Sequence, residues 1–294
     1  MLFDSKDVSL LLLLRHASVR AGRFAAAVVM ALLVGLAPAG ADAQVVTSLA
    51  NDGAGSLRAE ILAASQGAAI TFDPALTAGG PATITLTTGQ LEVAMDLTIQ
   101  GPGAALLTVS GNFGSRVFNI TGAADVTLSG LTVADGNTTG NGGGIAISST
   151  GTVNIVDNTI SGNVAGHGGG IYAESAGGAL NVIGSTISGN SVSGGSADGA
   201  GIYYRSTGKL TITDSTISNN DVTAINNGNG GGLFIQRPDG TSTSEITGST
   251  FSGNTVTSGG TYARGGGIAH VATGVFALSN STIVDNSVTS SLAL

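Results

Sequence analysis

The feature that most restricts the fold of this chain is a unit of about thirty residues that recurs from about residue 141 onward. Its clearest copy has a glycine triplet at 168–170, an alternating segment at 179–183 and Ser-Thr-Ile-Ser-Gly-Asn at 185–190. The Asn residues that close successive copies are separated by 27, 30, 34 and 32 residues: Asn163, Asn190, Asn220, Asn254 and Asn286. A near-constant period with three short strands in each copy predicts a solenoid.

The strands of each copy alternate with period two. Leu210 and Ile212 would point inward while Thr211 and Thr213 point outward. This alternation, together with 48 glycines, excludes helical repeats of similar length. We therefore predict an all-β fold, a right-handed, single-stranded parallel β-helix whose coils stack at about 4.8 Å.

Equivalent residues of successive copies are expected to form columns. The inward hydrophobic column is Ile160, Ile187, Ile217, Phe251 and Ile283. Glycines are expected where the backbone has positive φ or where two backbones approach closely, and each cluster ends at Gly144, Gly170, Gly201, Gly232 or Gly267. The closing Asn residues should stack amide on amide and satisfy backbone groups of the turn. The longer inserts at 193–198 and 222–229 are predicted to project as loops from one corner.

Residues 1–43 are predicted to be a signal peptide. Three arginines precede a thirteen-residue apolar stretch at 24–36, which is too short for a comfortable membrane span, and Ala41-Asp42-Ala43 has the small-x-small pattern of a cleavage site. We expect cleavage before Gln44 and therefore an exported protein with no transmembrane span after cleavage. The alternative is an uncleaved anchor.

Residues 44–68 are predicted to cap the stack, and residues 69–294 to form the β-helix. Ser56 is a natural helix N-cap, with Leu57, Ile61 and Leu62 on one face of a short helix. Arg58 and Glu60 are expected to face away from it. The last copy has no such cap, so the β-helix is expected to be incomplete at its C-terminal end and to associate end to end.

Composition limits the partners. With 42% hydrophobic and only 10% charged residues, the chain should fold and present a neutral polar surface. The net charge of −8 and the lack of a basic stripe argue against a nucleic-acid partner. The absence of Cys excludes disulfides and thiolate metal sites and is compatible with export.

Several segments carry a resemblance to a known family. These are Asp52-Gly53-x-Gly55-Ser56-Leu57-Arg58-x-x-Ile61, then Ile70-Thr71-Phe72-Asp73-Pro74, and the repeated Gly-Gly-Gly-Ile and Ser-Thr-Ile-x-x-Asn. The chain resembles bacterial right-handed parallel β-helix repeat proteins of the pectate-lyase-like superfamily, and within it the polymorphic outer-membrane-protein-like and adhesin-like surface proteins. The resemblance implies a β-helix at the cell surface or outside the cell. It is specific for the fold, because the matching residues build coils.

Lyases of this superfamily use clustered acids that hold calcium, with a basic residue that removes a proton. Asp157 and Asp214 occupy equivalent places here, but two coils separate them by about 10 Å. That distance is too long for one calcium ion, although a glycosidase pair would tolerate it. We therefore expect no catalytic residues, cofactor or metal, with calcium left open.

The few basic side chains of the repeats also have structural interpretations. Gly166-His167-Gly168 resembles a short polygalacturonase motif, but the rest of that pattern is missing, so His167 is interpreted as a loop residue. His270 is interpreted as a lone strand residue. Arg205 and Lys209 are interpreted as solvated charges at strand edges.

One outward array stands apart from the rest of the repeat. Its first column is Thr159, Thr186, Thr216, Thr250 and Thr282, and beside it lie Ser161, Ser188, Ser218, Ser252 and Val284. Such a flat hydroxyl grid resembles ice-binding surfaces, while the alternative explanation is strand propensity and solubility.

The sequence therefore predicts an exported surface or secreted adhesin-like module. It would present loops and a neutral Ser/Thr/Asn face to a glycan, matrix or cell-surface protein. The alternatives are a polysaccharide lyase or glycoside hydrolase, and an ice-binding protein.

Overall fold

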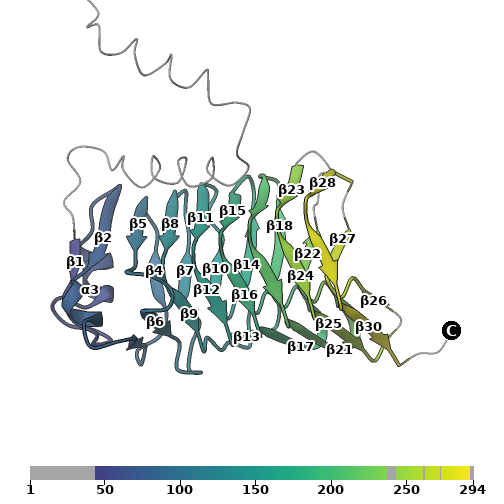
Figure 1. The fold of residues 1–294 in the computed structure, drawn as a ribbon, viewed down its shortest axis with the longest axis horizontal. Coiled ribbons are helices and arrows are strands. Elements are labelled where there is room, and N and C mark those ends of the chain that lie inside the picture. The colour runs from purple at the N-terminus through teal and green to yellow at the C-terminus, as the bar shows by residue number, and fades with distance from the viewer. Residues whose placement is uncertain (1–43, 237–242, 261, 272, 292–294) are drawn as a thin grey trace, which may run out of the picture. The chain divides into compact units, whose positions relative to one another are not determined.

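The computed structural model describes residues 44–236, 243–260, 262–271 and 273–291. The predicted signal peptide at 1–43 lies outside these ranges. Within them the strands form four sheets in which neighbouring strands are parallel, and consecutive strands of the chain enter different sheets. Figure 1 shows the coils in order from β1 and β2 at one end of the stack to β27, β28 and β30 at the other. The predicted all-β, right-handed parallel β-helix is confirmed.

The sheets are named here by their number of strands. The nine-stranded sheet contains β1 (Gln44–Val46), β2 (Ala68–Phe72), β5 (Leu97–Gln100), β8 (Val126–Ser129), β11 (Thr152–Val156), β15 (Ala179–Ile183), β19 (Leu210–Thr213), β23 (Thr243–Thr247) and β28 (Val275–Ser279). The eight-stranded sheet contains β3 (Ala82–Thr85), β6 (Leu107–Ser110), β9 (Thr132–Ala134), β12 (Thr159–Ser161), β16 (Thr186–Ser188), β20 (Thr216–Ser218), β24 (Thr250–Ser252) and β29 (Thr282–Val284).

The other two sheets complete the coils, and the six-stranded sheet begins only at β13. The seven-stranded sheet contains β4 (Leu91–Val93), β7 (Phe118–Ile120), β10 (Ile145–Ile147), β14 (Ile171–Ser175), β18 (Ile202–Ser206), β22 (Leu233–Gln236) and β27 (Ile268–Val271). The six-stranded sheet contains β13 (Val164–Ala165), β17 (Ser191–Asp198), β21 (Asp221–Asn229), β25 (Thr255–Ser258), β26 (Tyr262–Arg264) and β30 (Ser287–Ser290).

The hydrophobic core fills the inside of the coils. Ile160, Ile187, Ile217 and Phe251 are fully buried and in register, as strand alternation requires. The column ends differently in the last described coil, where Ile283 is 49% exposed. End-to-end association through that coil stays a prediction.

The inserts at 193–198 and 222–229 are not loops, and this part of the sequence interpretation was wrong. They lie in β17 and β21, which pair in parallel with one irregularity between Gly194 and Ser196. The two segments pair because their apolar side chains are buried in a second, small core. This core consists of Ala165, Val192, Ala197, Ala200, Val222, Ala224 and Val256.

The short helix α3 (Leu57–Ala63) covers the first coil and is followed along the chain by the 3₁₀ helix η1 (Pro74–Thr77). Ser56 caps α3 by accepting a hydrogen bond from the Ala59 N–H at 3.2 Å. Leu57 and Ile61 are buried, but Leu62 is 75% exposed, because only every third or fourth residue of so short a helix can face the core. The expectation for Leu62 was wrong.

Arg58 does not face away into solvent either. Its guanidinium donates to the backbone carbonyls of Gly89 at 2.6 Å and Gln90 at 2.7 Å. The side chain therefore fixes α3 to the segment that enters β4.

Candidate functional site

The predicted threonine column is longer than the sequence motif indicated. Strand pairing continues it through every strand of the eight-stranded sheet, in the order Thr83, Thr108, Thr132, Thr159, Thr186, Thr216, Thr250 and Thr282. The first three members were missed because their copies lack the Ser-Thr-Ile motif. Repeated Thr at the first outward position of a short strand was the available signal.

The second outward column of this sheet is equally free of charge. It consists of Thr85, Ser110, Ala134, Ser161, Ser188, Ser218, Ser252 and Val284. Most of the hydroxyl-bearing residues in both columns are partly exposed, whereas Ser110 and Ala134 are buried. We refer to the two columns together as the hydroxyl face.

From β12 onward, the turn after each strand of the hydroxyl face is built by the Asn column. Asn190 is fully buried, and its Oδ1 accepts hydrogen bonds from the Asn163 backbone N–H at 3.1 Å and from Asn163 Nδ2 at 2.9 Å. Its own Nδ2 donates to Ile160 O at 3.0 Å and to Asn220 Oδ1 at 2.9 Å. The same pattern repeats through Asn254 and Asn286, so each amide links neighbouring coils.

The third glycine of each cluster lies against this column. A Cβ at Gly170 would lie 3.1 Å from Asn190 Nδ2 and 2.6 Å from Gly201 O of the next coil. Gly144, Gly201, Gly232 and Gly267 have equivalent contacts with their own Asn residues. The sequence motifs Gly-Gly-Gly-Ile and Ile-x-x-Asn therefore occur together because their ends touch.

From β12 onward, the turn before each strand also has a column of its own, formed by Asn158, Ser185, Ser215, Ser249 and Ser281. Ser185 Oγ accepts from the Asn158 N–H at 3.1 Å, and Ser215 Oγ accepts from the Ser185 N–H at 3.1 Å. Because both turns are bonded from coil to coil, the three-residue strands between them are held in register.

A family model for the right-handed β-helix region matches residues 107–237 and 143–292. The chain belongs to the right-handed β-helix family. No curated protein matches the chain. The family is defined by its coil architecture, so membership alone names no substrate or partner. The closer resemblance to bacterial pectate-lyase-like and adhesin-like proteins stays a prediction.

The acidic pair considered for catalysis occupies a turn of this β-helix. Asp157 and Asp214 have φ of 52° and 48°, and Gly184 takes the equivalent place in the coil between them. A side chain at Gly184 would collide with the Asp157 carboxylate, so the alternation of Asp and Gly makes room for each carboxylate. Asp157 is exposed, but partial desolvation of its carboxylate raises its pKa. Among the described residues, no three His, Cys, Asp or Glu side chains are placed to hold a metal ion.

The basic residues considered in the sequence lie on different sheets. Arg205 and His270 belong to the seven-stranded sheet, whereas Lys209 directly precedes β19 of the nine-stranded sheet. Arg205 pairs with Glu174 at 2.8 Å, and Lys209 pairs with Glu245 at 2.7 Å. His167 Nδ1 lies 3.4 Å from Asp198 Oδ2, and the ring is 5.7 Å from that of Tyr203. His270 lies in β27 with its ring 5.2 Å from that of Phe276.

The sequence interpretation missed an aromatic column on the seven-stranded sheet. Tyr172 stacks on Tyr203 at 4.7 Å between ring centroids, and Tyr203 contacts Phe234 at 5.5 Å. Tyr203 and Phe234 are buried, and burial raises the pKa of Tyr203 to about 12. Their rings stabilise the sheet and leave little surface for a ligand. Aromatic residues directly after Ile171 and Ile202 were the signal.

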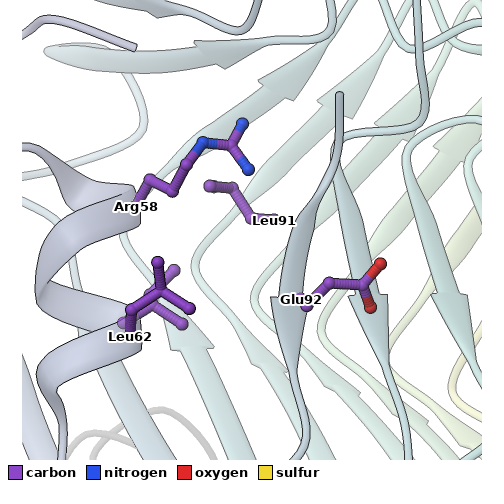
Figure 2. Close-up of a pocket in the computed structure, with 5 residues that line it drawn as sticks. Arg58, Leu62, Leu91 and Glu92 are labelled. Carbon is purple, nitrogen blue, oxygen red and sulfur yellow. The ribbon is translucent and has the colours of Figure 1, made fainter. Parts of the chain in front are cut away.

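A small pocket lies between the cap and the first coils of the β-helix. Figure 2 shows Arg58 and Leu62 on α3 beside Leu91 and Glu92 on β4. Its volume is about 80 Å³, below the range of ordinary ligand pockets. Its cation is already bonded to backbone carbonyls. The hydroxyl face is therefore the stronger candidate site.

Proposed function

We propose that this β-helix protein is a non-catalytic, adhesin-like binding module whose hydroxyl face binds an uncharged glycan surface. The observation that supports this proposal is the Thr column, which continues in register through all eight strands of its sheet. No ionisable residue interrupts either column of the face.

Repetition supplies the affinity in this mechanism. One hydroxyl hydrogen bond exchanged with water contributes only about 0.5–1.5 kcal/mol, so a single rung would bind weakly. Many rungs that contact one extended partner add their contributions, because later contacts form within an existing complex. The buried amide column keeps the rungs ordered before binding, which lowers the entropic cost. An uncharged face should also bind with little dependence on salt.

The test is adsorption of the purified chain to crystalline cellulose and chitin. The double variant Thr186→Lys, Thr216→Lys places two charges in the middle of the face, and we expect at least a tenfold loss of bound protein. Thr211→Lys is the matched control, because Thr211 is a partly exposed residue of a parallel strand in the nine-stranded sheet. The proposal fails if the double variant adsorbs as well as the unmodified chain and the control.

Ice is a second candidate partner, and the regularity of the face favours it. Rungs recur at about 4.8 Å along the stack, and the two columns are about 6.7 Å apart along each strand. A crystalline water surface would meet such a grid at many points at once. Thermal hysteresis of the purified chain, compared with the same two variants, tests this candidate. Hysteresis that is abolished only in the double variant would favour ice over glycan.

We also propose that the protein is exported through the signal at 1–43. None of the described helices is long and apolar enough to cross a membrane. Expression of the full chain in a bacterial host, followed by fractionation and mass spectrometry, tests the proposal. We expect an exported product that begins at Gln44. Retention of the complete chain inside the cell would contradict it.

A further inference from the structure

Phe113 has a backbone conformation that its residue type disfavours. Among the described residues, eight non-glycine positions have positive φ, and seven of them are Asn or Asp. Phe113, with φ of 53°, is the eighth. Asn and Asp tolerate the left-handed region because their short side chains bond locally, whereas a bulky residue there is an outlier. Gly or Asn would adopt this backbone conformation at a lower energetic cost.

The surrounding contacts hold this conformation in place. The Phe113 N–H donates to Asp135 O of the next coil at 2.8 Å. Ser110 Oγ donates to Asp135 Oδ2 at 2.9 Å and accepts from the Asn112 N–H at 3.1 Å. The Gly114 N–H closes the turn on Gly111 O at 2.9 Å. The loop is therefore fastened to the coil beside it.

Burial of the ring does not explain why Phe occupies this position. Phe113 is 62% exposed, so little of the strain is offset by packing. Exposed hydrophobic residues are common, but this one combines exposure with a disfavoured backbone. Strained residues of this kind cluster at ligand sites, which motivates a search for a ligand.

The position of the loop points to the hydroxyl face. Ser110 is the last residue of β6, and Asp135 directly follows Ala134, the last residue of β9. Phe113 therefore lies at the border of the face, beside the two rungs whose second-column residues are buried. At these rungs the second column presents no exposed hydroxyl group, and an exposed aromatic ring is available beside the Thr column.

We propose that Phe113 contacts the glycan, with the apolar C–H face of one pyranose ring stacked on the phenyl ring. This inference rests on the proposed function, because neighbouring sugars of the same chain would contact the Thr column. Aromatic side chains offer a large, rigid contact area at low entropic cost, which suits the apolar face of a sugar.

The chain contains no Trp, which makes a direct test possible. Phe113→Trp introduces a single indole at the proposed contact. We expect its emission to shift to the blue when cellohexaose or chitohexaose is added, and adsorption to the matching insoluble glycan to be kept. No spectral change at saturating hexaose, in a variant that still adsorbs to the matching insoluble glycan, would overturn the assignment.

Phe113→Asn separates binding from folding. We expect an unchanged or higher Tm, because Asn tolerates this φ, together with at least a fivefold loss of adsorption. Ile225→Asn is the control, since Ile225 is also a highly exposed apolar residue but lies in β21. A lower Tm for Phe113→Asn would show a structural role and overturn the inference.

The outcomes separate this inference from the proposed function. If Phe113→Asn adsorbs normally while Thr186→Lys, Thr216→Lys does not, the proposed function stands and the assignment of Phe113 is wrong. If the unmodified chain binds neither cellulose nor chitin but gives thermal hysteresis, both the glycan proposal and this inference fail.

Discussion

Two turns border the strands of the hydroxyl face, and different side chains link each turn to the equivalent turn of the next coil. In each turn a residue with positive φ is followed by a buried polar residue, for example Asp157 before Asn158 and Gly189 before Asn190. In the turn after the strand, each Asn bonds to the Asn of the next coil. In the turn before the strand, each Ser bonds to backbone groups alone.

The difference follows from the number of donors and acceptors. An amide offers two donors and an acceptor oxygen. The Asn220 side chain therefore bonds to the amides of Asn190 and Asn254, and also to backbone groups of the preceding coil. A hydroxyl has one donor, and Ser215 uses it on a carbonyl while accepting one N–H. The Asn turn should therefore contribute more to stability, and damage to it should affect two neighbouring coils.

Replacing Asn220 by Leu should give the largest effect. The side chain is fully buried, and its loss leaves the Asn190 N–H and Nδ2 and the Ile187 carbonyl without their partners. Unsatisfied buried groups cost about 1–3 kcal/mol each, so we expect a loss of at least about 3 kcal/mol. Urea denaturation and the Tm measure it. An unchanged melt would show that the amide column does not stabilise the stack.

Gly170→Ala should disturb the turn that contains Asn190, because the new methyl group would press against that amide. The new methyl would lie 2.6 Å from Gly201 O and 3.1 Å from Asn190 Nδ2, so the two coils must separate locally. Overpacking of this kind costs about 1–3 kcal/mol. Gly177→Ala is not a suitable control, because its φ is 111°. Gly79→Ala is suitable, since nothing lies within 4 Å of its Cβ position and its φ is not positive. Equal Tm values for Gly170→Ala and Gly79→Ala would contradict the close approach.

The Ser turn should tolerate more. Ser215→Ala removes one hydroxyl and leaves the Ser185 N–H without an acceptor, which should cost about 1–2 kcal/mol. Ser215→Asn tests the comparison further, because Asn158 already occupies this column and donates to Leu128 O at 2.7 Å. We expect the Asn variant to melt above the Ala variant. A Ser215→Ala loss as large as that of Asn220→Leu would show that the two turns are equivalent.

These turns also explain which parts of the fold could be predicted from the sequence. The Asn and glycine columns recur in register, so residues that are one period apart in the sequence contact each other in neighbouring coils. The β-helix could therefore be predicted from the period. Thr83 and Thr108 belong to the hydroxyl face but stand in copies without the motif, so only strand pairing revealed them. The inserts at 193–198 and 222–229 could not be predicted from the period in this way. Their register shifts between Gly194 and Ser196, so their sequences do not align as equivalent strands.

The Thr column of the candidate site could be predicted from the sequence, whereas the exposed Phe113 could not. Alternation places Thr186 outward whatever its neighbours are. Phe113 follows Gly111-Asn112, which predicts a turn, but turn preferences would assign positive φ to Gly or Asn and not to Phe. Arg58 shows the same limit, because its partners are carbonyls of a segment about thirty residues away. Such contacts depend on the assembled coil.

The smallest expected effect is a pH dependence in the turn before the strand. Asp157 lies exposed in its turn, and partial desolvation of its carboxylate raises its pKa, so the folded state binds the proton more tightly than the unfolded chain does. This contribution is fully present below the unfolded pKa, near 3.8, and is lost as the pH rises through the raised folded pKa. Asp157→Asn keeps a residue type that tolerates φ of 52° but cannot ionise. The variant should therefore melt slightly above the unmodified chain at pH 7, and the difference should vanish at pH 3. A variant that melts lower at pH 7 would mean that the carboxylate stabilises its turn.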